Sequence, residues 1–346
     1  MKYRVIGLMS GTSLDGVDLA YVIFNFDGSW QYELGICQTF SYDQNWIKEL
    51  KELHLKARDY INQIDNEYAK YLSNLISLFI KNNSLEVDLI CSHGHTVLHE
   101  PEKGITLQIG NGKIINESLD IPVVCDFRSL DVELGGQGAP LVPIGDEILF
   151  KEYNYCLNLG GFSNFSYTYN GERKAYDICP VNIALNHYSN KLGYKYDKNG
   201  DIAKNGSVNN QLLEKLNAIY YYHKPPPKSL GKEWLEKHFI PIVDMVEDTV
   251  ENKLCTLVEH AAIQIGKCIK EGNCLITGGG TFNSYLINKI KDHSVSKFTF
   301  NNKKLIEYKE AMIFGLLGVL HKENKINCLA SVTGAKRNSS TGKYFG

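Results

Sequence analysis

The stretch Ile6-Gly7-Leu8-Met9-Ser10-Gly11-Thr12-Ser13-Leu14-Asp15-Gly16-Val17-Asp18, near the N-terminus, decides the fold. An apolar run over residues 5–9 predicts a buried strand, and a second apolar run over 19–26 predicts a strand that returns beside it. The residues between the two runs are rich in Gly, Ser and Thr and include aspartates. The sequence therefore predicts a hairpin whose polar turn lies at the edge of a sheet.

This turn has the composition of a phosphate site. Glycine has no Cβ, so its backbone N–H can approach a ligand closely, and successive N–H groups form a concavity that suits anions. Thr12 and Ser13 add hydroxyl donors, whereas Asp15 and Asp18 would repel a phosphate unless a cation or a water lay between them. The pattern indicates a phosphate site with Mg²⁺ nearby, although it lacks the lysine and the helix of a P-loop. The alternative is an ordinary Gly-rich hairpin turn with aspartates in turn positions.

The bulk composition limits the classes of function. A chain of 346 residues suggests about two domains, and a net charge of −2 does not favour nucleic acid or an anionic membrane as a partner. The nine cysteines are scattered without a C-x-x-C pair, which fits a reducing cytosol better than a disulfide framework. The longest strongly apolar run, 311–320, is half of the ~20 residues that a membrane span needs. We therefore expect a cytoplasmic α/β protein.

The order of the expected elements suggests two α/β units that each begin with a hairpin. In the first unit we expect strands at 3–9, 19–26, 32–40, 87–91 and 122–126, and helices within 44–83 and 111–118. A Gly-rich join at 126–140 leads to the second unit, where we expect strands at 156–159, 165–169, 173–176 and 274–276 and helices at 143–151, 182–192 and 250–271. A last helix is expected at 310–320, and 331–335 is expected to be a closing strand or turn. Two facing hairpins would let one ligand be held from both sides.

Several stretches, in this order along nearly the whole chain, are typical of one family. Besides the opening stretch they are His93-Gly94-His95-Thr96-Val97-Leu98-His99-Glu100-Pro101, Asp126-Phe127-Arg128, Leu134-Gly135-Gly136-Gln137-Gly138-Ala139-Pro140-Leu141-Val142-Pro143, Asn158-Leu159-Gly160-Gly161, Pro227-Lys228-Ser229-Leu230-Gly231, Thr277-Gly278-Gly279-Gly280 and Val332-Thr333-Gly334-Ala335. In these stretches the chain resembles the bacterial anhydro-N-acetylmuramic acid kinases.

The resemblance implies an α/β, two-domain actin-like ATPase (ribonuclease H-like) fold with an interdomain cleft. It implies a first domain of residues 1–127 plus 328–346, a second of residues 128–327, and a homodimer. It also implies ATP and Mg²⁺ as cofactors. The family's reaction converts 1,6-anhydro-N-acetylmuramic acid, ATP and water to N-acetylmuramic acid 6-phosphate and ADP, in peptidoglycan recycling and amino-sugar catabolism.

The resemblance also implies roles for single residues. Asp177 is expected to be the catalytic base, because it occupies the first position of the family's Asp-Thr-Gly-Pro-Gly-Asn motif, and an ordinary pKa of ~3.9 would leave it ionised at neutral pH. Thr96, Arg128 and Glu310 match positions near the sugar. Asp15 is the expected Mg²⁺ residue, through a water. The ATP and phosphate groups are expected to contact Gly11, Thr12, Ser13, Leu14, Asp15, Gly16, Val17, Asp18, Gly160, Gly161, Gly278, Gly279 and Gly280.

Each of these roles has a simpler alternative. Asp177 could cap the helix that follows it, Arg128 could be a solvated surface side chain, and Glu310 could be a carboxylate favoured by a helix N-terminus. His93, His95 and His99 suggest a metal, but without another clustered ligand we do not expect zinc.

The chain departs from the family motif directly after Asp177. It has Ile178, Cys179 and Val181 where the family has Thr, Gly and Gly, and Val is poorly suited to the positive φ that a glycine can supply. This departure leaves open a catalytically altered ATP-binding protein of chaperone-like or regulatory type, or a kinase for a different sugar. A glycoside hydrolase that uses Asp177 with Glu310 or Glu100 is a further alternative, although such an enzyme needs no ATP.

Overall fold

The computed structural model describes residues 1–11 and 14–346, so Thr12 and Ser13 lie outside the described residues. The chain divides by contacts into two compact units, the first comprising Met1–Leu149 with Tyr308–Gly346 and the second Phe150–Glu307. These limits differ from the expected domain boundaries at both crossings: residues 128–149 and 308–327 contact the first unit. The assignment of functional domains to these units stays a prediction.

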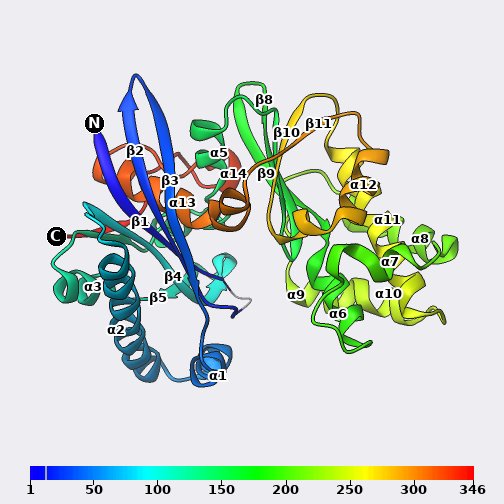
Figure 1. Cartoon of the computed structure of the whole chain (residues 1–346), viewed down its shortest axis with the longest axis horizontal. Coiled ribbons are helices and arrows are strands. Elements are labelled where there is room, and N and C mark those ends of the chain that lie inside the picture. Colours follow the sequence, from blue (N-terminus) through cyan, green and yellow to red (C-terminus); the bar gives the residue numbers. More distant parts are fainter. Residues whose placement is uncertain (12–13) are drawn as a thin grey trace. The chain divides into compact units, whose positions relative to one another are not determined.

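The first unit is built on a mixed sheet with the order β12-β6-β4-β1-β2-β3, to which β5 is added beside β4 (Figure 1). β2 and β3 run antiparallel to their neighbours, whereas β1, β4 and β6 are parallel to one another. The strands are β1 (Lys2–Ser10), β2 (Val17–Asp27), β3 (Ser29–Phe40), β4 (Leu89–Glu100), β5 (Ile105–Ile109), β6 (Val123–Cys125) and β12 (Lys343–Phe345).

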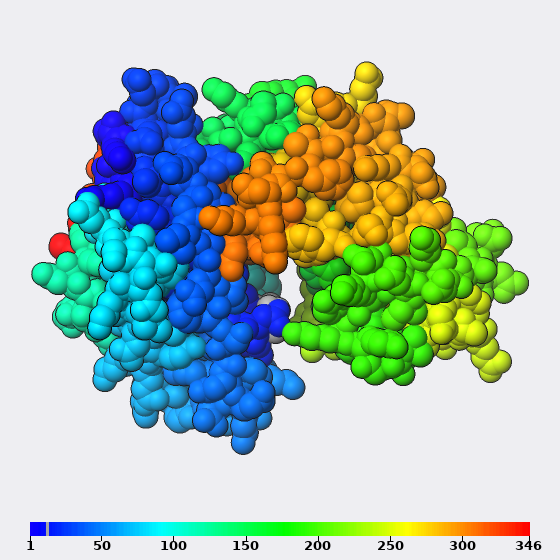
Figure 2. Space-filling model, in the orientation of Figure 1, coloured from blue at the N-terminus to red at the C-terminus, as the bar shows by residue number. Residues whose placement is uncertain are grey.

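Helices cover both faces of this sheet. Ile6 and Leu8 of β1 pack with α2 in one buried cluster, whereas Gly7 faces Ala311 of α13 on the opposite face. The N-terminal part of the chain, blue to cyan in Figure 2, forms most of this unit's surface in that view. The helices are α1 (Gln44–Glu52), α2 (Arg58–Asn83), α3 (Gly112–Leu119), α4 (Ser129–Glu133), α5 (Pro143–Leu149), α13 (Lys303–Lys322) and α14 (Ala330–Thr333).

The second unit repeats the same sheet plan. Its order is β11-β10-β7-β8-β9, with β8 and β9 antiparallel to their neighbours and β7, β10 and β11 parallel. Its strands are β7 (Tyr155–Leu159), β8 (Phe162–Tyr169), β9 (Glu172–Pro180), β10 (Asn273–Thr277) and β11 (Lys297–Phe300). Its longer helices are α6 (Asn182–Asn190), α8 (Asn210–Asn217), α11 (Val250–Cys268) and α12 (Ser284–Asp292). Shorter ones are α7 (Asp201–Lys204), α9 (Lys232–Trp234) and α10 (Ile240–Asp244).

An antiparallel three-strand meander followed by two parallel strands, present twice, is the arrangement of the duplicated ribonuclease H-like fold. The predicted α/β, actin-like fold class is therefore confirmed. The interdomain cleft stays a prediction.

Several expected element limits were wrong. β4 continues to Glu100, so His93 to Thr96 lie within a strand and not in a turn after it. Helix α13 begins at Lys303, seven residues before the expected start. Residues 330–333 form a short helix, and the closing strand is β12 instead.

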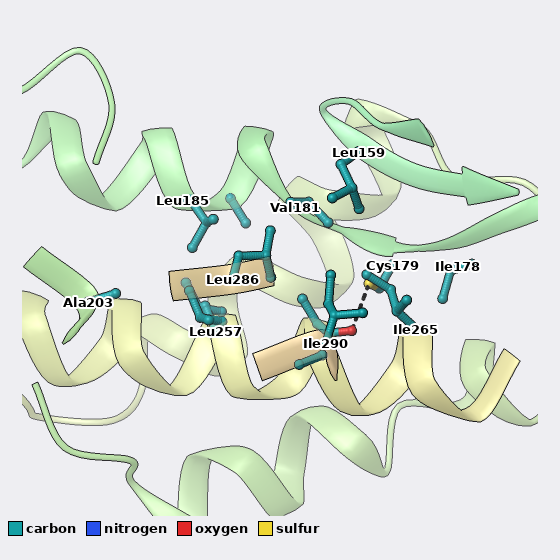
Figure 3. Packing of buried hydrophobic residues seen from close by; sticks show 14 of the residues in the cluster. Leu159, Ile178, Cys179, Val181, Leu185, Ala203, Leu257, Ile265, Leu286 and Ile290 are labelled. Carbon is teal, nitrogen blue, oxygen red and sulfur yellow. Dashed lines mark hydrogen bonds between the residues drawn. The ribbon is translucent and has the colours of Figure 1, made fainter. Parts of the chain in front are cut away.

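The core of the second unit contains the residues that depart from the family motif. Ile178, Cys179 and Val181 are 2%, 0% and 1% exposed and belong to one cluster with side chains from α6, α11 and α12 (Figure 3). The Sγ of Cys179 lies 3.9 Å from the carbonyl oxygen of Ala261 in α11, as the dashed line in Figure 3 shows. These substitutions are therefore core residues. The φ of −127° at Val181 shows that no positive φ is needed there, although its ψ of −99° lies outside the regions that a valine favours.

Every helix among the described residues is too short or too polar to cross a lipid bilayer.

Candidate active site

The first hairpin places the predicted phosphate turn directly after β1 and before β2. At the end of this turn the backbone of Gly16 lies close to that of Phe40 in β3. A Cβ on Gly16 would lie 2.3 Å from the Phe40 carbonyl oxygen, so only glycine fits. Leu14 has a φ of +58° and its N–H donates to the Gly11 carbonyl over 3.3 Å. Asp15, between Leu14 and Gly16, is exposed. Thr12 and Ser13, two of the predicted donors, lie outside the described residues.

A buried chain of hydroxyl groups and one imidazole holds the strand that carries this turn. Ser10 Oγ lies 2.6 Å from the Tyr42 hydroxyl and 3.0 Å from His95 Nδ1, and the Tyr42 hydroxyl lies 2.5 Å from that of Tyr68. Burial lowers the pKa of His95 to about 4, so its imidazole is neutral at pH 7. Sequence reasoning missed Ser10 and Tyr42 as supports of the site, because the partners come from β1, α2, β4 and the loop before α1, which are far apart in the chain.

Asp18 and Glu310, both on the first unit, interact electrostatically with each other. Asp18 Oδ1 accepts a hydrogen bond of 2.6 Å from Thr39 Oγ1. Glu310 also interacts with Arg128 and Lys309. Glu310 stands in the interior of α13, so the explanation by a helix N-terminus was wrong. Asp15 and Asp18 are carboxylates at a Gly-rich turn, and carboxylate oxygens are the ligands that Mg²⁺ prefers, so both side chains fit that ion.

Arg128 is held by two hydrogen bonds and is not a solvated surface side chain. Its Nε donates to His93 Nε2 over 3.0 Å and its Nη1 to the Gly138 carbonyl over 2.6 Å. Burial lowers the pKa of Arg128 to about 10, while the nearby Glu310 carboxylate acts in the opposite direction. Arg128 therefore stays charged at neutral pH and is fixed in orientation. Thr96, in β4, accepts a long hydrogen bond of 3.4 Å from Gln108 Nε2.

The three histidines of the His93–His99 stretch have separate partners. His93 bonds Arg128, His95 bonds Ser10, and His99 Nδ1 lies 3.1 Å from Thr106 Oγ1. Over residues 1–11 and 14–346, no group of three or more His, Cys, Asp or Glu side chains is arranged to hold a metal ion.

In the second unit the predicted glycines come together around two asparagines. A Cβ on Gly278, whose φ is +85°, would lie 2.4 Å from Asn158 Oδ1, and a Cβ on Gly280 would lie 2.8 Å from Leu159 Cβ. Asn182 Nδ2 donates to the Leu159 carbonyl over 3.0 Å. The N–H groups of residues 181–183 donate to the carbonyls of Gly160 and Gly161, so the start of α6 lies against that turn. A Cβ on Gly279 would meet, among the described residues outside its immediate chain neighbours, only Asn182 Nδ2 within 4 Å, at 3.9 Å.

Sequence reasoning did not name Asn182 as a functional candidate. It is the last residue of the motif that begins at Asp177, and this position in the motif could have identified it.

Asp177 lies in β9 with most of its carboxylate covered. Its Oδ2 accepts a hydrogen bond of 2.8 Å from the Leu230 N–H, and the Tyr221 hydroxyl donates to its carbonyl over 2.6 Å. Burial raises the pKa of Asp177 to about 6, although the Leu230 hydrogen bond acts to lower it. The expected ordinary pKa was therefore wrong. The N-cap of α6 is Val181, so the capping explanation of Asp177 was wrong as well.

The irregular segment at 224–231 supplies the cover of Asp177. Besides the Leu230 hydrogen bond, the Asp177 N–H donates to the Lys228 carbonyl over 3.3 Å. Lys228 Nζ donates to the Tyr221 carbonyl over 3.2 Å and lies over the Tyr176 and Tyr221 rings. Two stretches far apart in the sequence are thus one structure around the carboxylate. A buried carboxylate with a pKa near neutrality has the properties of a general base.

Comparisons with known proteins agree with this arrangement of motifs. A family model described as anhydro-N-acetylmuramic acid kinase matches residues 3–346. The anhydro-N-acetylmuramic acid kinase of Acinetobacter baylyi is 34% identical over 95% of this chain and 96% of its own length. That of Sulfurimonas denitrificans is 33% identical over the whole of both chains.

Solved structures give only distant likenesses. One is component A of the (R)-2-hydroxyglutaryl-CoA dehydratase of Acidaminococcus fermentans, with a TM-score of 0.46 and 11% identity over 91% of this chain and 96% of that one. Another is a hexokinase of Schistosoma mansoni, with a TM-score of 0.37 and 11% identity over 91% of this chain and 85% of that one. These scores are too low to support a statement on function. The full-length match to the family model and to its relatives shows that this chain belongs to the anhydro-N-acetylmuramic acid kinase family, a family of carbohydrate kinases.

Proposed function

We propose that this kinase opens 1,6-anhydro-N-acetylmuramic acid with water and phosphorylates the O6 that is released, forming N-acetylmuramic acid 6-phosphate and ADP. The observation that carries the proposal is the buried Asp177 carboxylate, with a pKa of about 6, in a chain that matches the family over its whole length. The role in peptidoglycan recycling and amino-sugar catabolism, a cytoplasmic location and a homodimer belong to the same proposal.

The reaction needs a base for water. Attack of water on the anomeric carbon breaks the bond from that carbon to O6, and the proton that water loses must be accepted. Asp177 would accept it, because its raised pKa brings the proton affinity closer to the working pH while leaving most of the carboxylate ionised at pH 7. The Leu230 N–H holds the carboxylate in one orientation.

The other half of the reaction is phosphoryl transfer to O6. We assign the β- and γ-phosphates of ATP to the turn from Gly11 to Asp18, with Gly160 and Gly161 as a second contact to these phosphates. We assign the nucleoside or the α-phosphate to Gly278–Gly280. Mg²⁺, held through water by Asp15, would neutralise phosphate charge. Arg128 would pair with the lactyl carboxylate of the sugar, with Thr96 and Glu310 nearby, since an arginine can bind a carboxylate through two N–H groups.

The alternatives find less support. The residues that depart from the family motif, 178, 179 and 181, fill the core of the second unit, so their presence does not point to a lost active site. A hydrolase would not need the Gly-rich turns that suit a triphosphate.

The test is incubation of the full chain with ATP, Mg²⁺ and 1,6-anhydro-N-acetylmuramic acid, followed by mass spectrometry of the sugar and an assay of ADP. Equal amounts of phosphosugar and ADP support the proposal. ATP binding without a phosphosugar would overturn it in favour of an ATP-binding regulator, and sugar opening in the absence of ATP would overturn it in favour of a hydrolase. If the protein phosphorylates another amino sugar but not this one, the assignment of the substrate is wrong.

A further inference from the structure

Asp131, in α4, is a fully buried carboxylate to which the proposed reaction gives no role. Its exposure is 0%, and both of its oxygens accept hydrogen bonds. Oδ1 accepts from Thr333 Oγ1 over 2.8 Å and from Cys328 Sγ over 3.1 Å, and Oδ2 accepts from the Gly138 N–H over 2.8 Å. A carboxylate inside a protein is costly unless its oxygens are satisfied, so such a complete set of donors points to a specific purpose.

These contacts join the Gly-rich loop, residues 134–138, to the C-terminal segment, residues 328–336. Backbone bonds complete the junction, from the Gln137 N–H to the Thr333 carbonyl over 2.9 Å and from the Lys336 N–H to the Leu134 carbonyl over 3.1 Å. A Cβ on Gly136 would lie 2.2 Å from Asp131 Oδ2, so the loop can pass over the carboxylate only as glycine. Two stretches almost two hundred residues apart, by the separation of 197 between Asp131 and Cys328, thus form one structure.

The loop transmits this junction to Arg128. Gly138 donates its N–H to Asp131 and accepts, at its carbonyl, the hydrogen bond from Arg128 Nη1. On its other side the guanidinium is held by His93, whose Nδ1 lies 2.9 Å from the Gly94 carbonyl and therefore carries the proton, which leaves Nε2 to accept from Arg128. The hydrogen bonds to His93 and Gly138 therefore fix the plane of the guanidinium and with it the direction of Nη2. The position of Gly138, in turn, depends on its hydrogen bond to Asp131.

We propose that Asp131, through Thr333 and Gly138, is a positioning residue that orients the Arg128 guanidinium for the carboxylate of the sugar substrate. The inference rests on the proposed function, in which Arg128 binds that carboxylate, and it extends substrate recognition to the C-terminal segment. It predicts that the junction affects substrates with a carboxylate and leaves those without one unaffected, because only the former need an oriented guanidinium.

The test removes one hydroxyl at the junction and compares it with a matched change elsewhere. Thr333→Val removes the hydrogen bond to Asp131 with little change of shape, and Thr333→Ser retains it. The matched control is Thr341→Val, since Thr341 is also fully buried in the C-terminal segment but donates to Asn327 Oδ1, over 3.0 Å. Each variant is assayed as the full chain, with the folded fraction checked by thermal unfolding.

Two sugars separate recognition of the carboxylate from general damage. For 1,6-anhydro-N-acetylmuramic acid, Thr333→Val should raise KM about three- to tenfold with kcat and the KM for ATP nearly unchanged, as expected for one misplaced hydrogen-bonding group. For 1,6-anhydro-N-acetylglucosamine, which lacks the lactyl carboxylate, the same variant should act like the wild type. Thr333→Ser should restore the wild-type KM, and Thr341→Val should lower stability without changing KM for either sugar.

A double-mutant cycle identifies the route of the effect. In an Arg128→Ala background, Thr333→Val should have no further effect on the KM for the carboxylate sugar, because the group through which it acts is gone. Additive effects in that cycle, or equal losses with both sugars, would overturn the inference while wild-type turnover leaves the proposed function standing. If the wild type itself does not phosphorylate the carboxylate sugar, the proposed function fails, and the inference fails with it.

Discussion

Asp177 is a residue whose environment changes its chemistry. Its position in the motif is visible in the sequence, and the resemblance implies a role as base, which stays a prediction. Its raised pKa is not, because the cover comes from Leu230, which is 53 residues away in the chain. A desolvated carboxylate holds its proton more tightly. The sequence therefore identified Asp177 as a candidate but did not predict that its pKa is raised.

The pH dependence of turnover follows from this pKa. The base must be ionised to accept the proton from water, and its pKa is about 6. We expect kcat/KM to be level above pH 7 and to fall about tenfold for each unit of pH below about 6. A pH-rate profile between pH 4.5 and 8.5 measures it. A profile that stays level to pH 4.5 would mean that the base has an ordinary carboxylate pKa or is another group.

The same burial predicts that Asp177 lowers stability at neutral pH. Its folded pKa, about 6, exceeds the usual aspartate value of 3.8, so the folded state binds more protons between these values and stability decreases as pH rises through them. Asp177→Asn should therefore raise the free energy of unfolding at pH 8 by up to about 3 kcal/mol, and this gain should vanish near pH 4. Urea unfolding at both pH values tests it, and a gain that is equal at the two pH values would contradict the assignment.

The departures from the family motif have a different consequence. Val181 and Cys179 are core residues of the second unit, so restoring the family glycine at either position removes packed atoms. We expect Val181→Gly to lower the free energy of unfolding by about 2–4 kcal/mol, from the cavity and from the added freedom of the unfolded chain. At a temperature where the variant stays folded, kcat/KM should be within about twofold of the wild type. Urea unfolding and initial rates measure the two effects, and a large gain in activity would show that Val181 impairs the site.

Among the elements, β1 and α13 approach unusually closely. A Cβ on Gly7 would lie 1.9 Å from the carbonyl oxygen of Ala311, and Gly315 faces Val5 and Phe24 from the same side of α13. This contact fixes the strand that leads into the phosphate turn against the helix that carries Glu310. The hydrophobic periodicity of the sequence cannot predict this contact, because it describes one helix or strand at a time and not how two of them pack.

We expect Gly7→Ala to lower the free energy of unfolding by at least about 3 kcal/mol, because the clash is with backbone that cannot move aside as a side chain can. Gly104→Ala is the control, since its Cβ would meet no atom within 4 Å and its φ of +71° should cost only about 1 kcal/mol. Thermal and urea unfolding compare them. Equal losses for the two variants would show that the helix does not pack as closely as described.

The strands and helices that the sequence predicted well are those with a strong local pattern. The meander of β1, β2 and β3 and the helix α11 were predicted to within a few residues. β4 was predicted too short, because its outer half contains polar residues and glycine, whose strand conformation is set by pairing with β5. Residues 330–333 gave no helical signal, and their helix is held by Asp131 through Thr333.

At the scale of the whole molecule, the strands β6-β4-β1-β2-β3 of the first sheet repeat the order and directions of β11-β10-β7-β8-β9 in the second. The sequence showed this only as two Gly-rich hairpins, because the repeat lies in topology and not in residue identity. We expected residues 128–149 and 308–322 in the second domain, whereas by contacts they belong to the first unit. The sequence could not show this, since their partners on β3, β5 and β1 are distant in the chain. The assignment of roles in one reaction to residues of both units is the central proposal.

In that proposal the turn from Gly11 to Asp18 of the first unit and the glycines at 160–161 and 278–280 of the second bind ATP, and Asp177 of the second unit activates water. The most direct measurement is turnover and ATP affinity of Asp177→Asn, by coupled ADP assay and calorimetry. We predict a loss of kcat of at least about a thousandfold with the ATP Kd within about twofold of the wild type. Wild-type turnover by Asp177→Asn would contradict the account.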